Sequence, residues 1–468
     1  MSTVDARTSA QTGAAPSKGA ARDRGGKSPD KSEKKREKFI PVTRFALMDR
    51  LTAREVWPRK QRNEARRFFR YLDYWRHQQY NARLIELEPA YEPFSPDSDL
   101  LATRKFTADE LETLKARVFE QAAEMLEQAN YERIDPHESD LIVTADSTFG
   151  LDFEVDMDAF EDILIFYRGT SKKRESRRAL RKFYLTEYFD VPIYRRLCIV
   201  FKLKAFEARV AQIMANEKLS RKEAEKKVKR LRSFLPPQIK DEYIYLKLFK
   251  NIPTNDLEMI FPNTQVRFRM FDKLKLGGSA SFGVGAGVYT SLGKIALLTS
   301  PYTAVPALAG FGAILFRQTM NFFNQKQRYM VVMAQNLYFH SMADNRGVLI
   351  KLADRAAEED VKEEMLLYSV LAKEKVNRND LPDIDRAIEK YLTTTFGVDV
   401  DFDVMDALRR LLHDGIVVEE PDGALTVMPP GKAAEHLDAK WDVFLDNLPN
   451  VLDEEGEVFE GTPGATAS

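Results

Sequence analysis

Hydrophobic and polar positions follow two patterns over most of the chain. Residues 39–83 and 107–130 repeat apolar side chains at a helical spacing, with charged residues between them. Residues 131–204 instead hold short runs of aromatic and β-branched side chains, which predict strands and a small α+β domain. Residues 205–235 return to a helical spacing and carry many lysines and arginines, so we expect one long, basic, amphipathic helix there.

One stretch departs from both patterns. Residues 276–316 contain a single charged residue, Lys294, in a chain in which 31% of the residues are charged. The hydrocarbon core of a bilayer is about 30 Å thick and needs roughly 20 apolar residues per helix, so we expect a two-helix transmembrane hairpin over residues 276–323. Three glycines would let these helices pack closely: Gly283, Gly287 and Gly310. The alternatives are a helical hairpin inside a soluble core and a hairpin that enters one leaflet only.

Residues 379–447 predict a winged-helix-like module. Helical patterns cover residues 384–396 and 404–413, and two short strands follow around an Asp-Gly turn. Residues 381–430 contain four basic and eleven acidic side chains, a balance of −7. Because DNA recognition relies on lysine and arginine to neutralise phosphates, we expect this module to dock a protein partner and no nucleic acid.

Together these patterns predict a mainly helical α+β fold, with a small mixed α/β N-terminal domain, the two-helix transmembrane hairpin and the C-terminal winged-helix-like module. The predicted segments are a disordered basic tail (1–38), a helical plus small α+β domain (39–204), a basic helical segment leading to the membrane (205–275), the hairpin (276–323), a helical segment (324–378), the winged-helix-like module (379–447) and an acidic disordered tail (448–468). The formal net charge is −1, so any electrostatic argument must be local. The single cysteine, Cys198, excludes an intramolecular disulfide, and its apolar surroundings in the sequence favour a core position.

Two groups of charged residues are candidates for chemistry. One predicts a contact with phosphate, a lipid headgroup or RNA, or else a solvated loop or helix face: Lys172, Lys173, Arg174, Arg177, Arg178, Arg181 and Lys182. In the other, Asp152, Glu154 and Asp156 alternate along a predicted strand and would share a face that could hold a divalent cation, although we favour a solvent-facing edge. The chain carries no P-loop, nucleophile elbow, zinc-protease motif or dinucleotide fingerprint, so we expect no cofactor, no metal and no assigned catalytic residue.

Several short motifs, taken in order, indicate a known family. Tyr167-Arg168-Gly169 follows a predicted strand, Asn251-Ile252-Pro253 precedes the apolar run, and Asn345-Arg346-Gly347 follows it. With these motifs the chain resembles, over residues 39–445, the transmembrane protein 143 family, which is also catalogued as domain of unknown function 3754. The resemblance implies a membrane protein, mitochondrial in animals and present in bacteria and plants, without an established activity and without catalytic residues to carry over.

The combined expectation is a membrane-anchored adaptor or scaffold of unknown molecular activity. Its domains would contact anionic lipid through the basic elements and a protein partner through residues 379–447, and we expect no nucleic-acid partner for the chain. Basic residues flank both ends of the apolar run, so the positive-inside rule places both termini in the cytoplasm, at a bacterial plasma membrane or, in a eukaryote, a mitochondrial membrane. The alternatives are a homo-oligomeric pore or transporter subunit built from the glycine-rich hairpin, and a membrane-associated enzyme that uses Asp152, Glu154 and Asp156.

Overall fold

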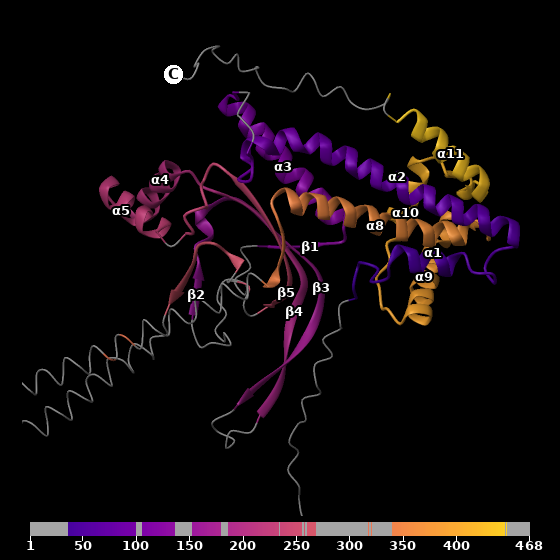
Figure 1. The fold of residues 1–468 in the computed structure, drawn as a ribbon, viewed down its shortest axis with the longest axis horizontal. Coiled ribbons are helices and arrows are strands. Elements are labelled where there is room, and N and C mark those ends of the chain that lie inside the picture. The colour runs from indigo at the N-terminus through magenta and orange to yellow at the C-terminus, as the bar shows by residue number, and fades with distance from the viewer. Residues whose placement is uncertain are drawn as a thin grey trace, which may run out of the picture. The chain divides into compact units, whose positions relative to one another are not determined.

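The central sheet combines four strands from residues 132–253 with one strand beyond residue 340 (Figure 1). The computed structural model describes residues 36–99, 105–135, 152–178, 186–233, 235–254, 257, 260–267, 317, 320, 339–444 and 446. Five antiparallel strands follow the order β1-β3-β4-β5-β7: β1 Glu132–Ile134, β3 Phe160–Arg178, β4 Thr186–Leu203, β5 Ile244–Pro253 and β7 Ser341–Asp344. A separate pair joins β2, Asp152–Val155, to β6, Thr264–Arg267.

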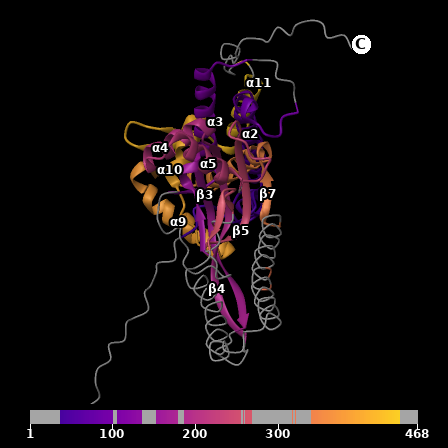
Figure 2. The ribbon, with the colours of Figure 1, turned by 90° about the vertical axis from the view of Figure 1, so that its left-hand side faces the viewer.

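Strands β3 and β4 are much longer than their neighbours. They pair along their whole lengths, whereas β1 pairs only with residues 165–167 of β3 and β5 pairs with residues 193–202 of β4. Their far ends therefore run on as a two-stranded ribbon, which Figure 1 and Figure 2 both show extending past the other strands. The basic segment that begins at Lys172 forms part of this ribbon, where the sequence had predicted a loop or a helix face.

The two faces of the sheet bury different cores, because alternate side chains of a strand point to opposite sides. Three helices pack on one face: α2 (Arg59–Tyr91), α3 (Ala108–Gln128) and α8 (Arg346–Leu371). Phe166 and Cys198 belong to this core, whereas their neighbours Ile165 and Leu197 belong to the core of the opposite face. Cys198 is fully buried, so the predicted core position is confirmed.

A third core joins α2 and α8 to four further helices and three short strands. The helices are α1 (Arg44–Leu51), α9 (Leu381–Phe396), α10 (Val404–His413) and α11 (Pro430–Asp442), and the strands are β8 (Val376–Asn377), β9 (Val417–Glu419) and β10 (Ala424–Val427). The short 3-10 helices η1 (Glu92–Phe94), η3 (Met157–Ala159) and η7 (Arg378–Asp380) lie in connections between other elements. The three short strands pair in the order β8-β10-β9. At the centre, the rings of Phe68 and Tyr368 lie 4.4 Å apart, which ties α2 to α8.

Two short helices, α4 (Phe206–Glu217) and α5 (Arg221–Arg232), lie between β4 and β5 in the chain. The sequence predicted one continuous helix over residues 205–235. Lys218 instead adopts the left-handed conformation, with φ of 53°, and ends α4. Ser220 and Glu223 then form a capping box that starts α5. The break lets the two apolar stripes pack against each other.

The predicted fold class is wrong. In the described part of the chain no helix is both long and apolar enough to cross a bilayer, which contradicts the two-helix transmembrane hairpin and the predicted multi-pass membrane location. The hairpin interval, residues 276–323 with Gly283, Gly287 and Gly310, lies outside the described residues apart from positions 317 and 320. The prediction rested on a lack of charge, but this run is rich in Gly, Ala, Ser and Thr rather than Leu and Ile. The predicted small N-terminal α/β domain is replaced by the five-stranded antiparallel sheet.

Candidate functional site

The middle of α8 buries an unusual number of charged side chains. Six of the seven residues from 358 to 364 are charged, and each is at most 7% exposed: Glu358, Glu359, Asp360, Lys362, Glu363 and Glu364. Burying a charge is costly unless it is paired and hydrogen-bonded. Taken alone, the sequence of residues 358–364 looks like part of an acidic helix that faces solvent. The apolar residues on both sides of this acidic run, between Val348 and Leu371, indicate instead that other elements cover every face of the helix.

Two arginines from other helices pair with these acids. Arg76 of α2 donates to both carboxylate oxygens of Glu364, from Nε at 2.7 Å and from Nη2 at 3.0 Å. Its Nη2 also donates to Asp414 Oδ2 at 2.6 Å. Burial disfavours the charged guanidinium, but Glu364 and Asp414 outweigh it and raise the pKa of Arg76 above its ordinary value.

Arg410 of α10 connects the same helix to more carboxylates. Its Nε donates to Glu364 Oε1 at 2.9 Å, its Nη2 donates to Glu363 Oε2 at 2.5 Å, and its Nη1 lies 3.2 Å from Asp360 Oδ1. It also contacts Asp406, one turn earlier on α10. The guanidinium therefore bridges α8 to α10 through several charge-assisted hydrogen bonds.

Neutral donors complete the network. The Tyr80 hydroxyl donates to Asp360 Oδ2 at 2.8 Å, and Asn130 Nδ2 donates to Glu363 Oε1 at 2.9 Å. Burial raises the pKa of Glu363 to about 7, and Asp360 adds to the effect, although Arg410 opposes it. Glu363 is therefore a buried carboxyl whose pKa lies near neutral pH.

Members of this network line part of a hollow of about 1400 Å³. Its walls come from α2, α3, α8, α9, α10 and the segment before α10. Nine carboxylates line it, namely Glu86, Glu124, Glu127, Asp360, Glu363, Asp385, Asp401, Asp403 and Asp406, against five cations, namely Lys38, Arg76, Arg83, Arg409 and Arg410. Acidic residues therefore outnumber lysines and arginines in the lining by four. We call this space the acidic hollow.

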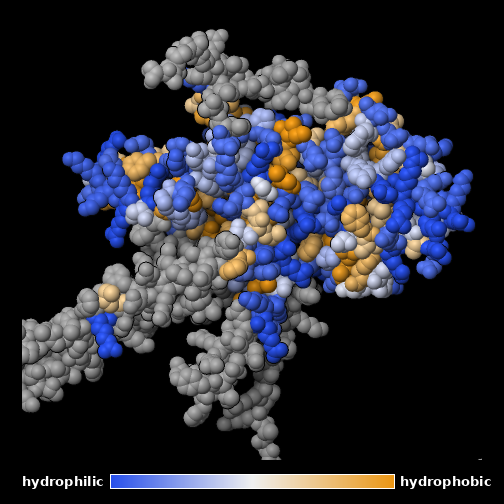
Figure 3. Space-filling view, in the orientation of Figure 1, coloured by the Kyte–Doolittle hydropathy of each residue, from blue (hydrophilic) through white to orange (hydrophobic). Residues whose placement is uncertain are grey.

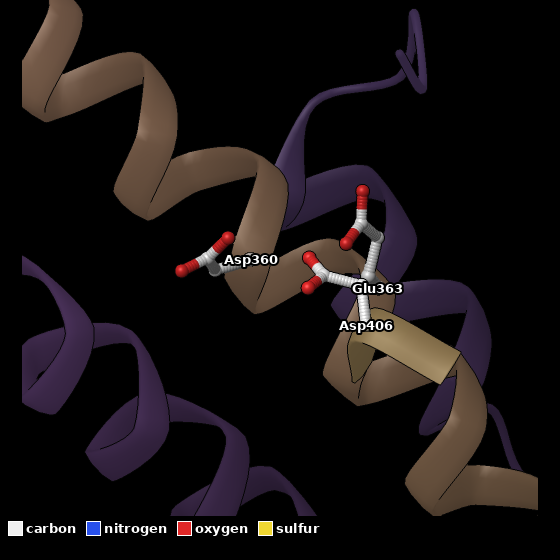
Figure 4. Close-up of side chains that lie close together, drawn as sticks. All are labelled: Asp360, Glu363 and Asp406. Carbon is white, nitrogen blue, oxygen red and sulfur yellow. The ribbon is translucent and has the colours of Figure 1, made fainter. Parts of the chain in front are cut away.

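Three of its carboxylates gather where α8 meets α10 (Figure 4). Oxygen atoms of Asp360, Glu363 and Asp406 lie within 4.8 Å of one another, an all-oxygen set of the kind that Mg²⁺ or Ca²⁺ takes. The Arg410 guanidinium contacts all three side chains, so a positive charge already occupies the space between them. A divalent cation would have to displace Arg410. The geometry therefore assigns these acids to ion pairing rather than to metal coordination.

The candidate residues from the sequence lie elsewhere. Lys172, Lys173 and Arg174 are exposed on the β3–β4 ribbon; Arg177 and Arg178 lie on β3 without described side chains, and Arg181 and Lys182 are outside the described residues. Asp156 accepts two hydrogen bonds from Arg209 Nη2, both at 2.8 Å, while Asp152 and Glu154 lie on β2 without described side chains. None of the described members of these groups lines the acidic hollow.

The family motif residues shape the sheet. Arg168 is buried, with its guanidinium 4.8 Å from the ring centre of Phe39 and 5.1 Å from that of Tyr131. Gly169 has φ of +74°, and a Cβ there would meet the Phe39 ring at 2.8 Å. In the second motif, Asn251 has φ of 54°, Ile252 is buried and Pro253 ends β5. These motif residues therefore determine side-chain packing and backbone conformation in the sheet.

Part of the chain matches a known protein family. Residues 160–347 match the model of a family described as Protein of unknown function (DUF3754). The match supports the uncharacterised domain that the resemblance indicated, without confirming the transmembrane protein 143 naming. It begins at the first residue of β3 and stops at the start of α8, so the helices that form the acidic hollow lie largely outside it. No solved structure matches the chain.

Proposed function

We propose that this protein is an adaptor whose acidic hollow binds a lysine- and arginine-rich segment of a partner protein. The observation that carries the proposal is the composition of the hollow, nine carboxylates against five cations. Four of the five cations, Arg76, Arg83, Arg409 and Arg410, already contact acidic residues. The remaining negative charge is available to a ligand.

Three carboxylates of the hollow are not used for ion pairing within the described part of the fold. Glu86, Glu127 and Asp385 line the hollow and form no ion pair with any described residue. Oδ1 of Asp385 is inaccessible to solvent and has no hydrogen-bond partner among the described residues. Burial raises the pKa of Asp385 to about 6, and the neighbouring carboxylates Glu389 and Asp401 add to the effect. A cationic group near Asp385 would reverse this repulsion.

The size and lining of the hollow favour a peptide over a small molecule. Small-molecule pockets measure roughly 300 to 1,000 Å³, and the hollow is larger. Met405 lines it with 45% of its surface exposed, and the buried Phe402 and Tyr80 also belong to the lining. Lysine and arginine bury their aliphatic stems on such surfaces while their charged ends reach carboxylates. This combination suits an extended basic segment.

The test is a fluorescence anisotropy titration of the full chain with a labelled peptide of alternating lysine and arginine. The variant Asp385→Asn removes a carboxylate from the hollow, whereas Asp383→Asn removes one from the same helix at an exposed position outside it. If each hollow contact contributes about 0.4 to 0.7 kcal/mol, the double variant Glu127→Gln/Asp385→Asn should bind about four- to tenfold more weakly. Equal losses in Asp385→Asn and Asp383→Asn, or no binding at low salt, would show that the hollow is not the docking site.

A further inference from the structure

A second charged surface lies on α5, away from the residues that line the acidic hollow. Helices α4 and α5 bury a small core of their own between them, which contains Val210, Ile213, Ala224 and Val228. The apolar side of α5 is thereby covered, and its opposite side faces solvent. Figure 3 shows a largely hydrophilic surface over these two helices.

Three lysines line up along the solvent side of α5. Lys222, Lys226 and Lys229 are exposed, and their spacing of four and three residues places them on one face of the helix. They are separated along the axis by rises of about 6 Å and about 4.5 Å. None of the three pairs with an acid among the described residues, and we call them the lysine face.

The neighbouring cations of α5 behave differently. Arg221 pairs with Glu207 and Glu225, and Lys227 places its Nζ 2.5 Å from Glu217 Oε1. Arg232 likewise pairs with an acidic residue. The helix thus separates cations that are neutralised within the fold from those that are not, which are the lysine face and the exposed Arg230 beside it. Unpaired positive charges at a regular spacing are complementary to a ligand that presents negative charges at a regular spacing.

We infer that the lysine face binds the phosphate backbone of a nucleic acid without reading its sequence. An amphipathic helix gains much of its lipid affinity from an apolar face inserted into the bilayer, and that of α5 is buried against α4, which leaves lipid only the weaker attraction of charge. Protein interfaces are built around exposed aromatic or aliphatic anchors and are depleted in lysine, and no large hydrophobic side chain is exposed in the described part of residues 204–240. Backbone binding to nucleic acid requires only positioned lysine and arginine.

The expected effect follows from counterion release. For a single strand the slope of log K against log salt is about −0.7 for each phosphate neutralised, so three lysines account for about −2. If wild type and variant converge near 1 M salt, Lys222→Gln/Lys226→Gln/Lys229→Gln should bind about 100-fold more weakly at 0.1 M salt. Lys226→Gln alone should bind about fivefold more weakly on the same basis.

The experiment is an anisotropy titration of a labelled single-stranded oligothymidylate with the full chain between about 50 and 200 mM salt. The matched control is Lys227→Gln, which removes the same charge from the adjacent position but from a cation paired with Glu217. The inference predicts a flatter salt slope for Lys226→Gln and an unchanged slope for Lys227→Gln. Equal effects of the two variants, or no binding of the oligonucleotide by wild type, overturn it.

Competing occupants are separated in the same series. Co-sedimentation with vesicles of phosphatidylglycerol and phosphatidylcholine, and titration with a labelled oligo-glutamate peptide, are repeated for Lys226→Gln and Lys227→Gln. Vesicle or peptide binding that depends on Lys226, with no oligonucleotide binding, assigns the face to lipid or to an acidic protein and overturns the inference. Oligonucleotide binding that depends on Lys226 supports it.

Discussion

Replacing Glu363 by glutamine should remove a specific pH dependence of stability. The carboxyl is fully buried on α8, and its pKa is raised from 4.5 to about 7 because burial and Asp360 disfavour the charged form. The unfolded chain releases this proton near pH 4.5, whereas the folded protein holds it until pH 7. Between these values the folded state binds more protons, so wild-type stability falls as the pH rises through this window.

The magnitude follows from the shift. One pKa unit corresponds to about 1.4 kcal/mol, so the full window is worth about 3 kcal/mol. Between about pH 5 and pH 8 the contribution changes by about 2 to 3 kcal/mol. Glutamine cannot ionise, yet its amide oxygen can still accept the hydrogen bond from Asn130. The stability of wild type minus that of Glu363→Gln should therefore fall by about this amount across the range.

Urea unfolding followed by tryptophan fluorescence at several pH values measures this difference directly. The control is Glu127→Gln, which removes an exposed carboxylate from the same hollow. Its difference from wild type should vary little with pH. A difference between wild type and Glu363→Gln that stays constant from pH 5 to pH 8, or that grows with pH, would refute the assignment of a raised pKa to Glu363.

Three further predictions test other parts of the fold. Arg410→Ala leaves buried carboxylates without their cation, so it should lower the free energy of unfolding in urea by about 3 to 5 kcal/mol. Replacing the exposed Arg409 by alanine should change that free energy by no more than about 0.5 kcal/mol. Similar losses in the two variants would contradict the role given to Arg410. Gly169→Ala combines a positive φ with a contact of 2.8 Å to an aromatic ring, so it should lower the unfolding temperature more than Gly397→Ala, whose φ is +68° but whose Cβ meets no described atom within 4 Å. Burial raises the pKa of Cys198 to about 12, so a thiol reagent should leave the folded protein unmodified and react after unfolding; fast reaction of the folded form would contradict the core position.

Local patterns in the sequence predicted several elements because their causes are local. The capping box of Thr107 and Glu110 starts α3, and the helical pattern over residues 404–413 coincides with α10. The membrane hairpin failed because a shortage of charge is weaker evidence than a surplus of leucine and isoleucine. The length of β3 and β4 was missed because charged residues on a ribbon carry no period-2 apolar signal.

The buried network could not be predicted from neighbouring residues. Glu364 receives its hydrogen bonds from Arg76, which is 288 positions away, and from Arg410, which is 46 positions away. Only the tertiary fold brings these charges together, so the acidic stretch of α8 looks like a solvated helix when it is read alone. The apolar residues around it were the available signal, since they leave no face for water.

The net charge of −1 conceals two surfaces of opposite sign. With 71 basic and 72 acidic residues the chain is balanced, yet carboxylates gather in the acidic hollow and unpaired lysines gather on α5. The two surfaces share no residue, and at physiological salt the Debye length of about 8 Å screens exposed charges from one another. Asp385→Asn should therefore weaken binding of the basic peptide and leave the affinity for oligothymidylate unchanged, while Lys226→Gln should do the reverse. Titrations of both ligands against both variants check this, and a variant that shifts both affinities at physiological salt would show that the two surfaces act as one site.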